Sequence, residues 1–272
     1  MNRRSIKMVA GKKLGFLLPV ALSLLVFVSW YTITPAKKHK LNSTDPKVAN
    51  LKLPENFRAE RLYSPGEHEQ GSWVAMTFDN KGRMIASSQF GNLYRLTIPP
   101  VGADTNVKIK VEPLQFKFPG DTSTLKIGFA HGLLYAFNSL YVMVNDEGNK
   151  NLKRGSGLYR LQDTDGDDQY DKVTLLKALE GRGEHGPHSI VLSPDKKSIY
   201  VIAGNFTKIP EMDKYRAFQG KTNDNLAPLV KDPNGHDNTV ASHGGWIAHV
   251  DSTGAKWELE FRSSSTCDTR TY

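Results

Sequence analysis

A run of acidic side chains between residues 163 and 171 is the part of this sequence best suited to chemistry. Oxygen-bearing side chains stand at positions 1, 3, 5, 7 and 9 of the run, which are Asp163, Asp165, Asp167, Gln169 and Asp171. Carboxylates at this spacing, with a backbone carbonyl near position 7, suit a hard cation that prefers oxygen ligands. The sequence therefore predicts a calcium site made by these five residues. The alternative is a solvated acidic turn between two strands.

The run differs from an EF-hand loop at two positions. Its glycine, Gly166, is at position 4 instead of 6, and position 12 is Thr174 instead of glutamate. The shorter form Asp-x-Asp-Gly-Asp-x-x-x-Asp resembles the calcium loops of dockerin and thrombospondin type. Because the run would join two strands at the outer edge of a sheet, we expect the ion to have a structural role.

A second candidate site is the segment Glu184-His185-Gly-Pro-His188. An imidazole has an unperturbed pKa of about 6.5, so it can accept a proton near neutral pH. His185 is therefore a candidate catalytic base, and Glu184 is its acidic neighbour. The alternative is a loop histidine that packs against the residues around it.

Three similar hairpins must position these motifs. Each has an apolar strand, a turn rich in Asp, Asn, Gly or Lys, and a second apolar strand, and they span residues 73–88, 131–145 and 188–203. A third strand is predicted after each hairpin, at residues 91–96, 157–161 and 245–250, and the first two of these share the sequence Leu-Tyr-Arg-Leu. Fourth strands are predicted within residues 107–118, 172–176 and 257–261.

Four strands per unit, repeated radially, is the plan of a β-propeller. The predicted fold class is therefore all-β, a β-propeller of about three blades of an expected six within residues 53–261, after an N-terminal transmembrane helix. An irregular β-sandwich with chance similarity between its hairpins is the alternative. Three blades would leave open strand edges, so the ring must close with another chain or with further blades of a longer protein.

Residues 14–36 carry no charge and are long enough to cross a bilayer as a helix. The segment 1–13 before them and residues 37–40 after them are basic, and the longer basic side places the N-terminus in the cytoplasm. Residues 37–52 are polar and show no periodic pattern, so we interpret them as a linker. We expect a single-pass membrane protein with a periplasmic or extracellular propeller. A cleaved signal peptide and a buried core helix are the alternatives.

The net charge of +8 does not indicate a nucleic-acid partner. Residues 1–40 contain eight Lys and Arg and no Asp or Glu, so the other 28 of the 36 basic residues balance the 28 acidic ones. A formally neutral domain lacks the basic surface that phosphate backbones require. The single cysteine, Cys267, excludes an internal disulfide and a c-type haem attachment motif.

The segment from Glu184 to Asn205 resembles the glucose/sorbosone dehydrogenase propellers, which are six-bladed enzymes that use pyrroloquinoline quinone. It shares with them an acidic residue followed by His, a short polar stretch, three apolar residues, a Pro-Asp turn and a strand that ends in Gly-Asn. Residues 71–96, 157–205 and 244–261 are similar to a group of large proteins described as membrane-bound dehydrogenases or haem-binding domain proteins.

This resemblance implies that His185, beside Glu184, takes the proton of a substrate hydroxyl while hydride passes to the quinone. It also implies that Arg262 contacts the quinone, that the substrate is a sugar or alcohol, and that a cytochrome c accepts the electrons. The family continues after Arg262 with an apolar strand, whereas residues 262–272 show no strand pattern. We therefore expect an incomplete, N-terminal portion of such a protein. The alternatives are a non-catalytic propeller that binds carbohydrate or protein at the cell surface, and a non-functional gene fragment.

Overall fold

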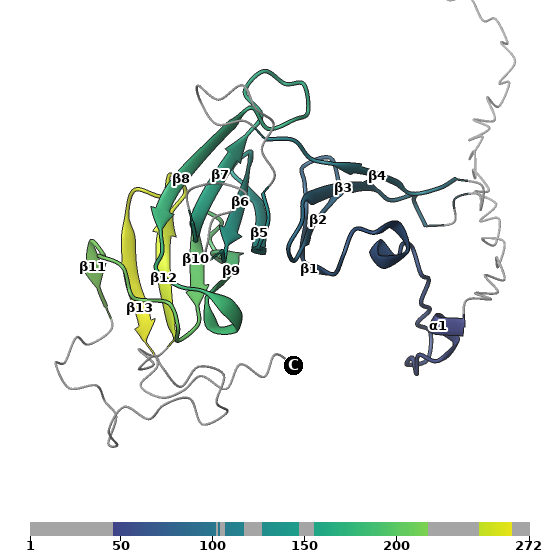
Figure 1. Cartoon of the computed structure of the whole chain (residues 1–272), viewed down its shortest axis with the longest axis horizontal. Coiled ribbons are helices and arrows are strands. Elements are labelled where there is room, and N and C mark those ends of the chain that lie inside the picture. Colours follow the sequence, from purple (N-terminus) through teal and green to yellow (C-terminus); the bar gives the residue numbers. More distant parts are fainter. Residues whose placement is uncertain are drawn as a thin grey trace, which may run out of the picture. The chain divides into compact units, whose positions relative to one another are not determined.

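Three β-sheets follow one another along the chain in the computed structural model (Figure 1). The structure describes residues 46–101, 103, 107–116, 127–146, 155–216 and 245–262. The expected membrane segment 14–36 and the tail after residue 262 lie outside these ranges. Within them, no helix combines the length and the apolar composition that crossing a bilayer requires.

Apart from the short strand β11, each sheet is built from antiparallel strands in chain order that the sequence pattern predicts. Sheet 1 contains β1 (Trp73–Phe78), β2 (Met84–Ser88), β3 (Leu93–Thr97) and β4 (Lys110–Pro113). Sheet 2 contains β5 (Ala130–Ala136), β6 (Ser139–Val144), β7 (Gly157–Gln162) and β8 (Lys172–Ala178). Sheet 3 contains β9 (Pro187–Leu192), β10 (Ser198–Ala203), β12 (Trp246–Asp251) and β13 (Trp257–Arg262), and a short strand β11 (Lys214–Tyr215) that runs parallel to β13. The all-β prediction is thereby confirmed for the described residues.

Short helical turns complete the described secondary structure, namely α1 (Pro46–Ala49) and the 3-10 turns η1 (Pro65–His68) and η2 (Gly183–His185). The hairpin turns follow their local chemistry. Phe137 and Asn138 both have φ of 51°, which is the left-handed conformation that a two-residue hairpin turn requires. In the first hairpin, the Asp79 carboxylate accepts the backbone N–H groups of Lys81 and Arg83, each at 2.9 Å, and so closes the turn.

Sheet 2 lies between the other two sheets, because its first strand, β5, contacts both β1 and β9. Two apolar cores result. One joins sheets 1 and 2 around Ile85, Leu140 and Val142, and the other joins sheets 2 and 3 around Tyr141, Met143 and Val201. Every residue of β6 is buried, since its alternate side chains enter the two different cores.

The first strands β1, β5 and β9 define two ends of the described sheets. We call the end at which these strands begin the histidine end, because His131 and His188 lie near the starts of β5 and β9. We call the other end, at which they lead into the hairpin turns, the turn end. Strands of six or seven residues rise about 3.3 Å per residue, so the two ends are roughly 20 Å apart.

Candidate functional site

The acidic run lies at the turn end, in the loop between β7 and β8. The carboxylates of Asp163, Asp165 and Asp171 offer oxygen atoms within 4.8 Å of one another. The other two predicted ligands have different contacts. Asp167 accepts the backbone N–H of Gln169 at 2.8 Å, and the Gln169 side chain lies 3.5 Å from the backbone N of Gln115. The fold thus gathers three of the five predicted ligands.

The loop is shaped by its own carboxylates. Asp163 accepts the backbone N–H groups of Gly166 and Asp168, at 2.7 and 3.0 Å, and Asp171 accepts the backbone N–H and the hydroxyl of Thr164. These bonds hold Asp168 with φ of 74°, which turns its side chain out of the loop. Asp168 was not among the residues predicted from the acidic pattern.

Asp168 connects sheet 2 to sheet 1. Its carboxylate pairs with Arg83, whose Nη2 lies 2.7 Å from Oδ1, and with Lys81, whose Nζ lies 3.0 Å from the same oxygen. Both cations belong to the first hairpin. The hydrogen bond from Arg83 is the main cause that holds the pKa of Asp168 well below its ordinary value of 3.8.

Arg95 of β3 extends this contact into the interior. Its side chain is only 3% exposed, and its Nη1 donates to the backbone carbonyl of Asp168 at 2.7 Å. On the sheet 1 side, the buried carboxylate of Asp79 accepts Nε of Arg83 at 2.8 Å and lies 3.9 Å from Nε of Arg95. A buried guanidinium is tolerated only when it is paired in this way.

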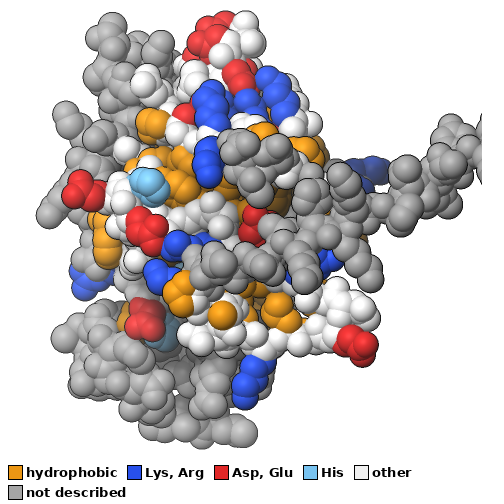
Figure 2. Space-filling model, turned by 90° about the vertical axis from the view of Figure 1, so that its right-hand side faces the viewer, with side chains coloured by type: hydrophobic (Ala, Val, Ile, Leu, Met, Phe, Trp, Pro, Cys, Tyr) orange, Lys and Arg blue, Asp and Glu red, His pale blue; other side chains and the backbone are white. Residues whose placement is uncertain are grey.

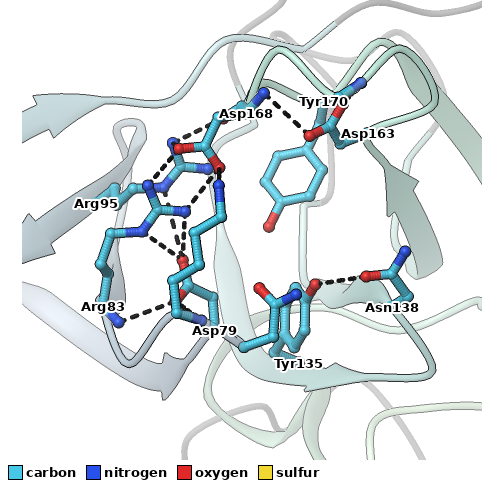
Figure 3. Close-up of a pocket in the computed structure, with 11 residues that line it drawn as sticks. Asp79, Arg83, Arg95, Tyr135, Asn138, Asp163, Asp168 and Tyr170 are labelled. Carbon is cyan, nitrogen blue, oxygen red and sulfur yellow. Dashed lines mark hydrogen bonds and ion pairs between the residues drawn. The ribbon is translucent and has the colours of Figure 1, made fainter.

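These residues line a cavity of about 170 Å³ between the first hairpin and the acidic loop (Figure 3). The hydroxyl of Tyr135 donates to the Asn138 side chain at 3.1 Å, and the Tyr170 ring projects into the cavity from the loop (Figure 3). Burial raises the pKa of Tyr170. Because the cations at this cavity are already paired with carboxylates, the arrangement is better suited to joining two sheets than to holding an anion.

The histidine end offers a different chemistry. The rings of His131 and His188 stack with centroids 5.5 Å apart and planes within 9°. Nε2 of His188 contacts the backbone carbonyl of Glu184, and the Asn145 side chain donates to the carbonyl of Gly183 at 2.7 Å. Side chains from sheets 2 and 3 are therefore brought together beside η2.

Folding keeps the imidazole of His131 neutral near pH 7. Burial and the neighbouring His188 lower its pKa from 6.5 to about 4. Nδ2 of Asn145 lies 3.3 Å from Nδ1 of His131, and an amide N–H can donate there only if Nδ1 carries no proton. In the tautomer that accepts this N–H, the imidazole proton resides on Nε2, which is buried and has no hydrogen-bond partner among the described residues.

The predicted catalytic pair occupies η2, next to these histidines. His185 is 7% exposed, its ring lies 4.9 Å from that of Phe206, and its backbone carbonyl accepts the Phe206 N–H at 3.0 Å. The side chain of Glu184 is exposed. The base role of His185 stays a prediction, and the contact with Phe206 is the packing that the alternative interpretation describes.

Arg262, the predicted quinone contact, ends β13 at the histidine end. Pro187, Ala203, Trp246 and Arg262 are successive partners in one row across sheet 3. Three strand spacings of about 4.8 Å place Arg262 roughly 14 Å from the start of β9. Glu184 and His185 are neighbours within η2, and Arg262 lies at some distance from the start of β9, which follows η2.

Two functional candidates, His131 and Asp168, were not predicted from the sequence. The sequence could have indicated His131, because His131 and His188 begin two of the similar hairpins. No feature of the sequence could have indicated Asp168, since nothing in the acidic run distinguishes a carboxylate that reaches another sheet from one that faces the loop.

A further acidic group, His249 with Glu258 and Glu260, lies on sheet 3. Both glutamates pair with Arg216, at 2.9 and 3.2 Å, so we interpret this group as a surface ion-pair network.

Neither the scan against protein-family models nor the search of curated proteins found a match for the chain.

Proposed function

We propose that the described sheets are part of a β-propeller of the glucose/sorbosone dehydrogenase type, held outside the cytoplasm by residues 14–36. Support comes from the position of the first strands, because β5 contacts both β1 and β9 while the later strands of each sheet follow in order away from them. Four-stranded sheets whose first strands adjoin are the repeating unit of a propeller. The sequence similarity between the hairpins fits the same plan.

We propose that the histidine end binds a sugar or alcohol hydroxyl. The observation that carries this proposal is the buried Nε2–H of His131, which lacks an acceptor among the described residues. A buried donor without a partner costs about 1–3 kcal/mol, and a ligand oxygen that accepted it would remove this cost. Because its pKa is lowered to about 4, the imidazole is neutral near pH 7 and offers one directed hydrogen bond and no net charge.

The quinone expected from the resemblance is a tricarboxylate, so it needs several cations that face one space. Among the described residues of this end, Lys208 pairs with Glu180 at 3.2 Å and His131 is neutral. Arg182 precedes η2 and is exposed, and Arg262 is roughly 14 Å from the start of β9 by strand spacing. These residues do not assemble a binding set for the quinone, and we derive no catalytic step through it. The role of His185 as base, and of cytochrome c as acceptor, remain part of the proposal from resemblance alone.

A second candidate function is non-catalytic binding of carbohydrate at the cell surface. The packing of His185 against Phe206 favours it, because a catalytic base must reach the substrate hydroxyl. Both candidates place the ligand at the same end of the sheets. The two candidate functions differ in whether the protein oxidises the bound ligand.

Binding and oxidation can be measured separately on the full chain. Titration of sugars and alcohols, followed by ligand-observed NMR, should show binding that falls at least tenfold in His131→Phe and is unchanged in His249→Gln. Reduction of a dye in the presence of the quinone and Ca²⁺, lost in His185→Ala, would support the dehydrogenase. Binding without dye reduction would support the non-catalytic function. If no sugar or alcohol binds, the proposal for this end is wrong.

We also propose that Ca²⁺ binds the acidic loop through Asp163, Asp165 and Asp171. The closeness of their oxygens fits a cation with oxygen ligands. Binding to the folded state alone raises stability with ligand concentration, so millimolar Ca²⁺ should raise Tm and EDTA should reverse the rise. Asp171→Asn should abolish the response, and Asp195→Asn, in the hairpin turn of sheet 3, should retain it. An unchanged Tm in the unmodified chain would exclude the ion.

A further inference from the structure

The side chain of Asn145 joins the two parts of the histidine end. Asn145 directly follows β6 and is only 4% exposed. Its backbone N–H donates to the carbonyl of Phe129 at 2.8 Å, so the residue is fixed beside the start of β5. Its side-chain amide contacts both His131 and η2, the turn that carries the predicted pair Glu184 and His185.

The orientation of this amide follows from its two contacts. The same atom, Nδ2, donates to the carbonyl of Gly183 at 2.7 Å and lies 3.3 Å from Nδ1 of His131. A carbonyl oxygen can only accept, so the nitrogen of the amide, and not its oxygen, must face Gly183. An amide nitrogen carries two protons, and the second is available to His131, which has to accept it at Nδ1. The proton of the neutral imidazole is thereby left for Nε2.

Close packing keeps the amide in this place. Gly186 follows η2, and a Cβ there would lie 2.4 Å from Oδ1 and 2.7 Å from Nδ2 of Asn145. The backbone of Gly186 therefore packs directly on the amide. From sheet 3, His188 stacks its ring on His131 and contacts the carbonyl of Glu184 through Nε2. His131 thus contacts two side chains, one from sheet 2 and one from sheet 3, and both of them also bind carbonyl groups of η2.

We infer that Asn145 is a positioning residue, whose amide keeps the imidazole proton of His131 on Nε2 and so makes this ring a hydrogen-bond donor toward the ligand. The inference rests on the hydroxyl binding proposed above and names a residue that controls it. A ligand hydroxyl that accepts from Nε2–H keeps its own proton for another acceptor. With the imidazole proton on Nδ1, Nε2 would be an acceptor and would take that hydroxyl proton. The ligand would then make one hydrogen bond fewer.

The position of the proton can be measured in the ligand-free full chain. Long-range ¹H–¹⁵N correlation spectra of protein with ¹⁵N-labelled histidine distinguish the two tautomers, and His131→Phe identifies the signals of His131 by their loss. Near pH 7 we expect the proton on Nε2. Asn145→Asp should place a proton on Nδ1, because a carboxylate only accepts hydrogen bonds. Asn138→Asp, the same change in the hairpin turn at the turn end, should leave the His131 signals unchanged.

A second variant separates this effect from a defect in folding. Asn145→Asp buries a charge, which can unfold the chain, whereas Asn145→Leu has a similar shape and no charge. Asn145→Leu removes both N–H donors, while the carbonyl of Gly183 keeps the N–H of Gly186 at 3.1 Å. The preference for Nε2 is then lost, so both tautomers of His131 should be populated. A proton that stays on Nε2 alone in both variants, or a proton on Nδ1 in the unmodified chain, would overturn the inference.

Ligand binding shows whether Asn145 acts through His131. Asn145→Leu should lower the affinity for sugars or alcohols roughly three- to tenfold, the worth of one neutral hydrogen bond. In the His131→Phe background the same change should cause no further loss, because the ring on which it acts is absent. An equal loss in both backgrounds would mean that Asn145 only supports the fold and would overturn the inference. If the unmodified chain binds no sugar or alcohol, the binding proposal fails, and the spectra still decide the position of the proton.

Discussion

His131 shows how the surroundings of one residue set its chemistry. Free histidine takes up a proton near pH 6.5, whereas burial next to His188 delays this to about pH 4 in the folded chain. Between these two pH values the unfolded chain binds more protons than the folded chain, so the stability contributed by this site rises with pH. The residue is thus kept as a neutral hydrogen-bond donor over the physiological range.

The titration of His131 should make the stability of the protein depend on pH. The free energy of unfolding should rise from pH 4 to pH 6.5 in the unmodified chain, and His131→Phe should flatten this rise because it removes the titrating group. Urea unfolding at several pH values measures the slope. His249→Gln should keep the slope of the unmodified chain. Equal slopes in all three proteins would show that His131 titrates normally.

Gly132 decides how closely two sheets can approach. A Cβ at this position would collide with the backbone carbonyl of His188 and touch the side chain of Met143. Both neighbours belong to the packed contact between sheets 2 and 3, so neither can move without loosening it.

We therefore predict that Gly132→Ala destabilises the protein by about 1–3 kcal/mol, the usual cost of overpacking. In a chain of this size that lowers Tm by roughly 2–4 °C per kcal/mol. Gly66→Ala is the matched control, because a Cβ on Gly66 meets nothing within 4 Å. Thermal unfolding followed by circular dichroism distinguishes them, and equal Tm values would contradict the close approach.

At the scale of elements, the loop between β7 and β8 joins two sheets. Its carboxylates bond its own backbone, and this presents Asp168 to Arg83 and Arg95 of sheet 1. The loop is therefore both the candidate calcium site and the attachment point of the first sheet, which gives a bound ion a route to stabilise more than its own loop.

Asp168→Asn should weaken this attachment. Because Asp168 is about one-third exposed and solvent screens it, we expect a loss of at most about 1 kcal/mol at pH 7. A carboxylate whose pKa is lowered by folding contributes stability above its ordinary pKa of 3.8 and loses it as the pH falls through the lowered value. The difference between the two proteins should therefore persist from pH 7 down to about pH 4.

Thermal unfolding in EDTA measures this difference without a contribution from calcium. Asp167→Asn, a change one residue earlier in the same loop, should leave Tm nearly unchanged, because Asp167 bonds only within the loop among the described contacts. High salt should reduce the effect of Asp168→Asn. An equal loss in both variants would show that the loop, and not the ion pair, is responsible.

At the scale of the whole described structure, sheet 2 is the centre. It is covered on both faces, whereas sheets 1 and 3 each have exposed apolar side chains, such as Met76 and Val191, on the side away from sheet 2. Figure 2 views the molecule from the side of sheet 1 and shows hydrophobic side chains with charged groups around them. Local opening costs most where burial is most complete.

Amide hydrogen exchange should therefore be slowest in β6, all of whose residues are buried. It should be faster in β4, which lies at the edge of sheet 1 and has no fully buried residue. Exchange followed by mass spectrometry of peptides resolves the two segments. Slower exchange in β4 than in β6 would contradict the central position of sheet 2.

The strands of this protein could be predicted from its sequence, for a local reason. Apolar alternation and turn residues determine local structure over four to eight positions. The hairpins at 73–88, 131–145 and 188–203 can therefore be predicted without knowledge of any tertiary contact. The repetition of Leu-Tyr-Arg-Leu likewise indicated equivalent third strands. The short strand β11 escaped prediction, because two residues paired in parallel to β13 leave no periodic signal.

The candidate sites could be predicted from the sequence only in part. The spacing of acidic residues predicted a loop that gathers carboxylates, and the structure gathers Asp163, Asp165 and Asp171. It could not show that Asp168 faces Arg83, since these residues are 85 positions apart and meet only when sheets 1 and 2 pack. Nor could it show that His131 is neutral, because a pKa depends on burial and on neighbours from another sheet.

The sequence by itself thus determined the all-β character, the order of the strands and the place of the acidic loop, because these follow from neighbouring residues. Only the tertiary structure decided which side chains meet between sheets, which faces remain open and which histidine keeps an unsatisfied proton. Those properties depend on distance and burial in three dimensions, and neither is encoded in the spacing of residues along the chain.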